Sequence, residues 1–201
     1  MTAFDDLEAR LRGGLHDSAL PELGAAAEAA GLLDVAYALE DSPVGRLLLA
    51  ATPEGLVRLA YLDDGEDAVL QALAARISPR VLAAPARLDN ARRELDEYFA
   101  GRRTEFAIAL DRRLARGFAQ RVLAATSTIP YGRTSTYAAV AAQAGSPRGW
   151  RAAGNALGAN PLPIVVPCHR VIATGGGLVG YTGGVQRKRV LLDIEEAGER
   201  L

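Results

Sequence analysis

The sequence has one cysteine, one methionine and one tryptophan among its 201 residues, and only 5% of its residues are aromatic. One cysteine excludes an intrachain disulfide and any zinc site built from several cysteines. No apolar run approaches the ~20 residues of a membrane-spanning helix. The start, Met-Thr-Ala-Phe-Asp-Asp, has early acids and no apolar segment, so no secretory signal is expected. These absences predict a protein of the reducing cytoplasm that does not associate with membranes.

Acidic residues are absent from one long stretch of the chain. Residues 112–192 contain 11 basic residues and no aspartate or glutamate, whereas residues 1–111 carry 11 basic and 20 acidic residues. The net charge of −1 therefore hides an acidic first part and a basic second part. A surface rich in cations and free of carboxylates suits a phosphate backbone. The pattern favours modest, salt-sensitive DNA binding, although neutralisation by the acidic part of the same chain would also explain it.

The single cysteine, Cys168, stands beside one of the two histidines, His169. An isolated cysteine can be an inert core residue, but Pro167 before it and Arg170 after the histidine are poor core material. A thiol attacks as its thiolate, and a neighbouring imidazole can accept its proton near neutral pH. The apolar run 164–166 predicts a short buried strand that the proline ends. We therefore expect a nucleophilic thiol at a strand-to-loop edge.

Periodicity and turn signals predict an α+β fold. Residues 3–31 suggest a helical segment, in which the lone His16 would be solvated or capping. Turns at Ser-Pro-Val-Gly and Thr-Pro-Glu-Gly separate three runs that predict an antiparallel meander, over 35–39, 46–50 and 56–61. The remaining predicted elements are helices over 66–77, 88–99, 113–126, 135–144 and 148–158, and a strand near 106–108.

The helices over 135–144 and 148–158 are joined by Gly-Ser-Pro and look like a helix-turn-helix. The second helix carries Arg151 amid small residues, which are Ala152, Ala153, Gly154 and Ala156. Small residues on an exposed helix permit close approach to a groove, and close helix packing is an alternative of nearly equal weight. Several glycines between 175 and 184 predict a backbone-rich loop after Cys168.

Six short motifs follow one another along the second part of the chain: Ile-Pro-Tyr-Gly at 129–132, Thr-Tyr at 136–137, Arg-Ala-Ala-Gly at 151–154, Asn-Pro at 160–161, Pro-Cys-His-Arg at 167–170 and Gly-Tyr-Thr-Gly-Gly at 180–184. In this order and spacing the chain resembles the O6-alkylguanine-DNA alkyltransferase family, also called methylated-DNA–protein-cysteine methyltransferases. The resemblance is closest over 113–197 and looser over 35–112. Pro-Cys-His-Arg is its most specific part.

The resemblance implies three segments and one reaction. The segments are a helical N-terminal extension over 1–31, a ribonuclease H-like α/β domain with an antiparallel sheet over 32–111, and a mainly helical DNA-binding and alkyltransferase domain over 112–201. The reaction would be DNA repair by direct transfer of an alkyl group from O6-alkylguanine or O4-alkylthymine in double-stranded DNA to Cys168. Each molecule would act once, because no second cysteine could resolve the thioether. No cofactor and no metal are implied, and a monomer is expected.

The resemblance also implies roles for single residues. His169 would relay the proton of Cys168 through a water, and Glu195 would orient the imidazole, as the aspartate does in a serine triad. Glu195 could instead be a solvated carboxylate, because other glutamates lie nearby. Asn160 would tie the recognition helix to the active-site turn. The residues expected to line the substrate pocket are Tyr137, Tyr181, Thr182, Leu157 and Pro163. The residues expected to bind DNA are Arg151, which would fill the stack left by the flipped base, and Ala152, Tyr137, Arg148 and Arg170.

Three other functions remain open from the sequence. A cysteine hydrolase could use Cys168, His169 and Glu195, although adjacent cysteine and histidine rarely supply triad geometry. A non-catalytic alkyltransferase-like protein would bind the damage without a nucleophile, and the presence of Cys168 argues against it. A helix-turn-helix regulator would bind a specific DNA sequence without alkyl transfer.

Overall fold

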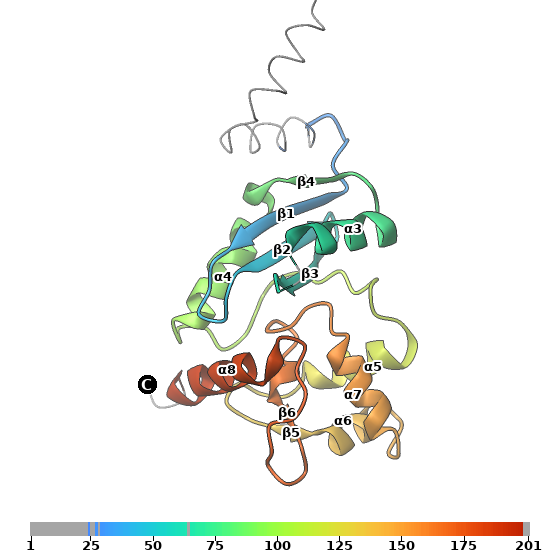
Figure 1. Ribbon diagram of the computed structural model, residues 1–201, viewed down its shortest axis with the longest axis vertical. Helices are drawn as coiled ribbons and strands as arrows, with labels where there is room; N and C mark the ends of the chain where they lie inside the picture. Colours follow the sequence, from blue (N-terminus) through green and yellow to red (C-terminus); the bar gives the residue numbers. More distant parts are fainter. Residues whose placement is uncertain (1–23, 25–26, 28, 64, 199–201) are drawn as a thin grey trace, which may run out of the picture.

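The computed structural model describes residues 24, 27, 29–63 and 65–198, which form a sheet domain followed by a helical domain (Figure 1). Nearly all of the predicted extension over 1–31, including His16, lies outside these residues. Among the described helices, none has the length and apolar character that crossing a membrane would require. The α+β fold class predicted from the sequence is confirmed.

The first domain is built on a four-stranded sheet. Its strands are β1 (Val35–Glu40), β2 (Leu47–Thr52), β3 (Gly55–Tyr61) and β4 (Val81–Ala83), in the spatial order β3-β2-β1-β4. The first three strands form the predicted antiparallel meander. The sequence does not predict β4, which pairs in parallel with β1, because a three-residue strand is too short to show alternation.

Two helices cover opposite faces of this sheet. On one face, α3 (Glu66–Arg76) packs Leu73 into a core with residues of all three meander strands. On the other face, the 3₁₀-helix η2 (Pro85–Leu88) leads into α4 (Asp89–Phe99), which buries Tyr98 completely. Both helices begin and end within about one residue of the predicted bounds.

The segment between the domains is not the strand predicted near 106–108. It meets the sheet through a single parallel bridge between Leu56 and Leu110. Gly55 permits this approach, because its φ is 139° and a Cβ there would lie 2.3 Å from Ala109 O. The alternating apolar residues that suggested a strand pack against the core without forming a ladder.

The second domain contains four helices and a small parallel sheet. The helices are α5 (Gly117–Thr126), α6 (Tyr137–Gln143), α7 (Trp150–Gly158) and α8 (Gly184–Gly198), and the sheet pairs β5 (Ser135–Thr136) with β6 (Val171–Ile172). The two short helices of the predicted helix-turn-helix are α6 and α7, which pack against each other.

Three helices of this domain begin later than predicted, and α7 does so by two residues, at Trp150 instead of 148. α5 begins four residues late, because Asp111 Oδ1 accepts the backbone N–H of Arg113 at 3.0 Å and holds that segment in a turn. α6 begins two residues late, because the preceding residues pair with β6 and Thr136 caps the helix. The Thr136 hydroxyl accepts the backbone N–H of Ala139 at 3.2 Å.

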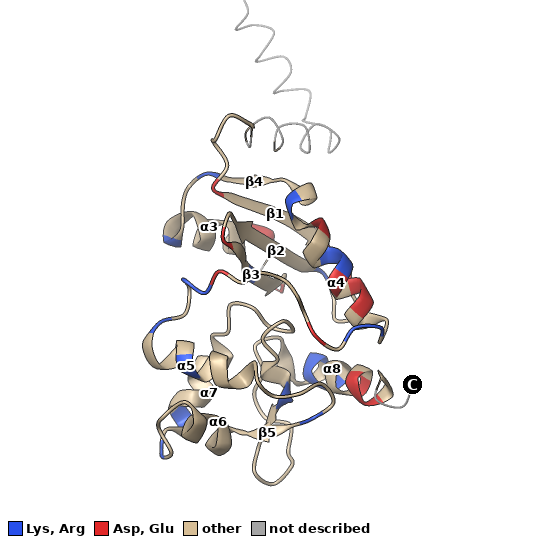
Figure 2. Cartoon of the chain, turned by 180° about the vertical axis from the view of Figure 1, so that it is seen from behind, with Lys and Arg blue, Asp and Glu red and all other residues tan. Residues whose placement is uncertain are grey.

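The two domains share a core and a polar boundary. The cluster that contains Tyr98 of α4 also contains Leu191 of α8. The backbone N–H of Leu59 on β3 donates to Pro161 O at 2.9 Å, and Arg187 on α8 pairs with Asp63. In Figure 2 the acidic residues lie on the first domain and on α8, whereas α5 and α7 carry basic residues and no acidic ones, and α6 carries neither. The charge division seen in the sequence is therefore a division in space.

Candidate active site

A buried turn brings Cys168 to its position. Residues 161–167 form turns in place of the predicted short strand. Ile164 has a φ of 73°, which a β-branched residue rarely adopts and which no strand uses. Asn160, directly after α7, fixes this turn, because its Nδ2 donates to Val166 O at 2.9 Å and contacts Cys168 Sγ at 3.1 Å. The amide side chain therefore ties α7 to the turn and to the thiol.

The thiol borders a large cavity. Cys168 begins the 3₁₀-helix η3 (Cys168–Arg170), and its side chain lines a cavity of about 930 Å³ between α6, α7 and the loop over 173–182. Only 4% of the residue is exposed, so the thiol lies deeper than the loop edge expected from the sequence. The volume falls in the range of sites that enclose a small organic ligand.

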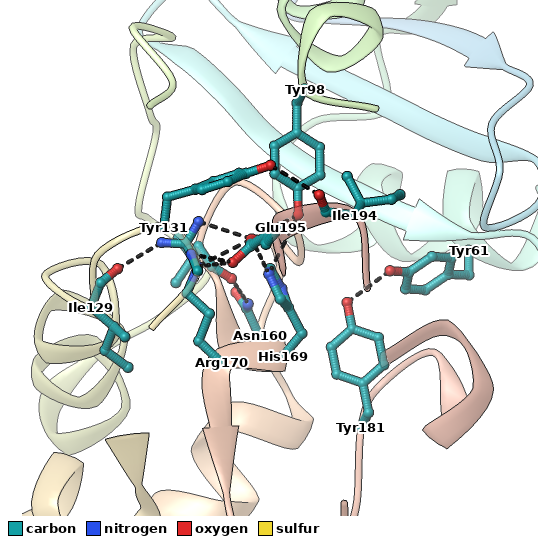
Figure 3. A network of polar contacts seen from close by, with 12 residues as sticks. Tyr61, Tyr98, Ile129, Tyr131, Asn160, His169, Arg170, Tyr181, Ile194 and Glu195 are labelled. Atoms are coloured by element: carbon teal, nitrogen blue, oxygen red, sulfur yellow. Dashed lines mark hydrogen bonds and ion pairs between the residues drawn. The ribbon is translucent and has the colours of Figure 1, made fainter. Parts of the chain in front are cut away.

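His169 and Glu195 form a buried pair beside this cysteine (Figure 3). His169 Nε2 lies 2.7 Å from Glu195 Oε1, and both residues are fully buried. An ionised carboxylate only accepts hydrogen bonds, so Nε2 carries the proton and Nδ1 is the basic nitrogen. Nδ1 is buried and has no hydrogen-bond partner within the described part of the chain. It is therefore able to accept a proton.

Arg170 is a partner of Glu195, and its predicted role in DNA binding is wrong. Its Nε donates to Glu195 Oε2 at 2.9 Å and its Nη2 donates to Oε1 at 3.0 Å (Figure 3). Its Nη1 donates to Ile129 O at 2.6 Å. Only 6% of the residue is exposed, so this guanidinium cannot reach a phosphate.

The charges of the pair are set by burial and by Arg170. Burial opposes ionisation of Glu195, but His169 and Arg170 outweigh it and hold the pKa of the carboxyl at about 2. Burial lowers the pKa of His169 below its ordinary value of 6.5, against the pull of Glu195. Because Arg170 already compensates the carboxylate, the imidazole stays neutral at pH 7 and can act as a base.

Cys168 is held as a neutral thiol. Burial raises its pKa to about 11, and the hydrogen bond from Asn160 and the charge of Lys188 offset part of that rise. Lys188, on α8, is fully buried, and its Nζ donates to Val171 O at 2.6 Å and to Val179 O at 3.2 Å. A thiol in this state needs a base to remove its proton before it can attack.

Four of the five predicted substrate-binding residues line the cavity, which are Tyr137, Leu157, Tyr181 and Thr182. The Tyr137 hydroxyl donates to Val179 O at 2.9 Å, which joins α6 to the loop. The Thr182 hydroxyl donates to Gly158 O at 3.0 Å, which joins the loop to α7. Pro163 is buried in the turn before Ile164 and is not among the residues that line the cavity, so its contact with substrate stays a prediction.

Three of the other predicted DNA-binding residues lie on or next to α7, and the fourth, Tyr137, lies on α6. Arg148, Arg151 and Ala152 are exposed. The Arg151 guanidinium lies over the ring of Trp150, 4.6 Å from its centre, and both side chains border the cavity. Two of the small residues of α7, Ala153 and Ala156, are buried. Helix packing therefore accounts for those two, whereas Ala152 is exposed on the surface of the helix.

Three residues of this site carry no signal in the sequence. Tyr98 of the first domain donates its hydroxyl to Glu195 Oε1 at 2.8 Å, across 97 positions. The hydroxyls of Tyr61 and Tyr181 hydrogen-bond at 2.8 Å, across 120 positions. Lys188 lies within a run of basic residues that looks solvent-exposed. Their partners are defined only by the tertiary fold.

Within the described residues, no group of three or more histidine, cysteine, aspartate or glutamate side chains is placed to hold a metal ion.

The buried imidazole makes folding sensitive to mild acid. The pKa of His169 is lowered in the folded chain, so the unfolded chain binds a proton more readily. The free energy of unfolding should therefore be greatest above the ordinary value of 6.5 and should fall as the pH drops below it. Thermal unfolding between about pH 7.5 and about pH 5, above the range of ordinary carboxyls, measures this. A His16→Ala variant should keep the decline, and a flat profile in both proteins would contradict a neutral, buried His169.

Comparison with known families accounts for both domains. Residues 35–112 match the family described as 6-O-methylguanine DNA methyltransferase, ribonuclease-like domain. Residues 117–197 match the family described as 6-O-methylguanine DNA methyltransferase, DNA binding domain.

Relatives and solved structures with similar sequences carry related names. A methylated-DNA–protein-cysteine methyltransferase of Mycobacterium tuberculosis is 42% identical over 161 residues, covering 80% of this chain and 92% of the relative. The constitutive enzyme of that name from Bacillus subtilis is 38% identical, covering 79% and 94%. The crystal structure of the Mycobacterium tuberculosis OGT in complex with DNA is 42% identical, with a TM-score of 0.71 over 81% of this chain and 94% of the other.

Proposed function

The chain belongs to the 6-O-methylguanine DNA methyltransferase family and acts in DNA repair by direct alkyl transfer, and we propose that Cys168 accepts the alkyl group from O6-alkylguanine in duplex DNA. The single observation that carries the assignment of the acceptor is the position of Cys168 Sγ. It is the one thiol of the sequence, it borders the large cavity, and its residue directly precedes His169, whose imidazole is paired with Glu195. O4-alkylthymine presents the same kind of alkyl–oxygen bond and is proposed as a second substrate.

The proposed chemistry is a displacement at the alkyl carbon. The sulfur of Cys168 forms a bond to that carbon while the bond between the carbon and O6 breaks, and the base leaves as its anion. The thiol proton passes through a water to His169 Nδ1, and the imidazolium returns it through water to the anion of the base, so the imidazole ends neutral. Glu195 and Arg170 keep Nε2 protonated and Nδ1 basic, so the imidazole is in the correct tautomer before the reaction.

The product limits each molecule to one reaction. A thioether is a poor leaving group, and no second cysteine exists to displace it. One chain supplies the thiol, the imidazole, the carboxylate and the cavity, which supports action as a monomer. A free thiol persists in a reducing compartment, so we propose that the protein acts in the cytoplasm.

The substrate base must leave the duplex to reach the cavity, because Cys168 is buried. We propose that α7 approaches the DNA and that Arg151 replaces the flipped nucleotide in the stack. Arg151 is exposed, borders the cavity and lies over Trp150. The nearby Tyr137 borders the same cavity, and its ring and hydroxyl would contact the extruded nucleotide.

The Arg151→Ala variant should lose far more activity on duplex DNA than on free O6-benzylguanine. Extruding a base costs a few kcal/mol, and a side chain that fills its place offsets part of this cost. The free base needs no extrusion, so it should react at close to the parental rate. Single-turnover rates on both substrates, with DNA affinity measured at several salt concentrations, test this.

Arg189→Ala is the matched control, because Arg189 is an exposed cation on α8 and does not line the cavity. It should react normally with both substrates. Equal losses of Arg151→Ala on the duplex and on the free base would mean that Arg151 supports the pocket or the fold, and its role in flipping would have to be abandoned.

A further inference from the structure

One side chain from the first domain reaches the buried pair of the second. Tyr98, near the end of α4, is fully buried, and its hydroxyl donates to Glu195 Oε1 at 2.8 Å (Figure 3). The same hydroxyl lies 3.5 Å from His169 Nε2. Any nearby carbonyl could accept a hydrogen bond from a buried hydroxyl. The Tyr98 hydroxyl instead donates to the carboxylate oxygen that also accepts from the imidazole of His169.

The Glu195 carboxylate is surrounded by donors on both oxygens. Oε1 accepts from Tyr98, His169 and Arg170, and Oε2 accepts from Arg170 and from the backbone N–H of Gly132. Each donor withdraws negative charge from the carboxylate and fixes its plane. The strength with which Glu195 holds the proton on Nε2 therefore depends on how many other donors share Oε1.

The titratable and charged groups around His169 come from four parts of the fold. They are Cys168 and Arg170 on η3, Lys188 and Glu195 on α8, Tyr181 on the loop and Tyr98 on α4. Arg170 and Lys188 disfavour a charged imidazole, and Glu195 favours it. Tyr98 is the group of the first domain that acts on this balance, and it does so through the carboxylate.

We propose that Tyr98 is a positioning residue for alkyl transfer, through which the first domain holds the Glu195 carboxylate in place and limits its attraction for the proton of His169. The proposal rests on the function proposed above, in which His169 takes the thiol proton. It gives the first domain a part in the chemistry beyond support of the fold.

The Tyr98 hydroxyl should affect the rate of alkyl transfer at acid pH. Without it, Glu195 Oε1 has one donor fewer and retains more negative charge for the imidazolium. His169 then becomes protonated at a higher pH, and a protonated imidazole cannot accept the thiol proton. The rate of alkyl transfer should therefore begin to fall at a higher pH than in the parent, while transfer at alkaline pH is nearly unchanged.

The test is the pH dependence of transfer from free O6-benzylguanine to the full-length protein, from about pH 5 to about pH 9. Tyr98→Phe keeps the ring and removes only the hydroxyl. The acid limb of its pH–rate profile should move to higher pH by about one unit. At a pH on the acid limb this is about a tenfold loss of rate relative to the parent. At the alkaline end its rate should lie within about twofold of the parent.

Tyr131→Phe is the matched control. The Tyr131 hydroxyl donates to Ile194 O at 3.3 Å, which is a backbone carbonyl of the residue before Glu195 on the same helix. This variant should keep the parental acid limb. A loss in Tyr98→Phe by one constant factor at every pH, or a shift of equal size in Tyr131→Phe, would mean that Tyr98 serves only packing.

Histidine NMR supplies a readout that is independent of transfer. The sequence has only two histidines, so a His16→Ala background leaves the ring of His169 alone in the spectrum. The midpoint of its titration should be higher in Tyr98→Phe than in the parent. An unchanged midpoint overturns the proposal for Tyr98 even if Cys168 is alkylated normally. Failure of the parent to alkylate Cys168 would instead overturn the proposed function.

Discussion

The Cys168→Ser variant is expected to transfer no detectable alkyl group while binding duplex DNA with an affinity within a few-fold of the parent. An alcohol ionises far less readily than a thiol, and burial that raises the pKa of the thiol to about 11 would disfavour an alkoxide still more. His169 could not compensate for that difference. The surface of α7 that we propose to bind DNA is exposed, so a substitution at the buried Cys168 should leave it unaffected.

Two measurements on the same preparation test this expectation. Transfer is followed with duplex DNA carrying O6-methylguanine at protein excess, and affinity is followed by fluorescence anisotropy with the same duplex. Cys168→Ala should behave like Cys168→Ser, because neither residue supplies a thiolate. Stoichiometric transfer by the serine variant would refute the assignment of Cys168 as the acceptor.

The Glu195→Gln variant should slow transfer by about 10²–10⁴, the usual contribution of a positioned acid–base group. A glutamine amide cannot compensate the charge of Arg170, and it does not hold the Nε2–H tautomer of His169 as a carboxylate does. DNA affinity should change little, because Glu195 is fully buried. Single-turnover rates at saturating DNA measure the effect on the chemical step.

Removing Glu195 also leaves the guanidinium of Arg170 buried without its ion pair, which costs about 3–5 kcal/mol of stability. Transfer rates must therefore be compared at a temperature below the unfolding transition of the variant. Glu196→Gln is the matched control, since Glu196 is the adjacent residue and is exposed. A rate for Glu195→Gln within about twofold of the parent would reduce Glu195 to a structural ion pair.

The local chemistry of the site could be predicted because the two reacting groups belong to adjacent residues. Cys168 and His169 are neighbours, and thiol next to imidazole already indicates a nucleophile and its base. Asn160 and most of the cavity residues follow from the family resemblance. Arg170 shows the limit of that reasoning, since its place in the motif does not reveal whether the side chain points outward or toward Glu195.

The backbone near the thiol was predicted wrongly for a physical reason. An apolar run of three residues before Pro167 fits a buried strand or a buried turn equally well. Tertiary contacts decide between them, because the Asn160 side chain bonds to Val166 O and Cys168 Sγ and holds Ile164 at a positive φ. The roles of Tyr98 and Tyr61 could not be predicted from the sequence for the same reason, because their hydrogen-bond partners lie on the other domain.

The fold was predicted best where turns carry strong local signals. The meander of β1, β2 and β3 follows from two proline–glycine turns between apolar runs. The short strands β4, β5 and β6 were not predicted, because two or three residues cannot establish a period. These strands exist through pairing with distant segments.

The most direct test of the account is the mass of the intact protein after incubation with excess duplex DNA that carries O6-methylguanine, followed by mapping of the modified peptide. We expect one adduct per chain, with a methyl group in place of the thiol proton of Cys168, and no further reaction with fresh DNA. An unmodified Cys168 after complete repair, a methyl group on any other residue, or repair of more than one equivalent of DNA would contradict it.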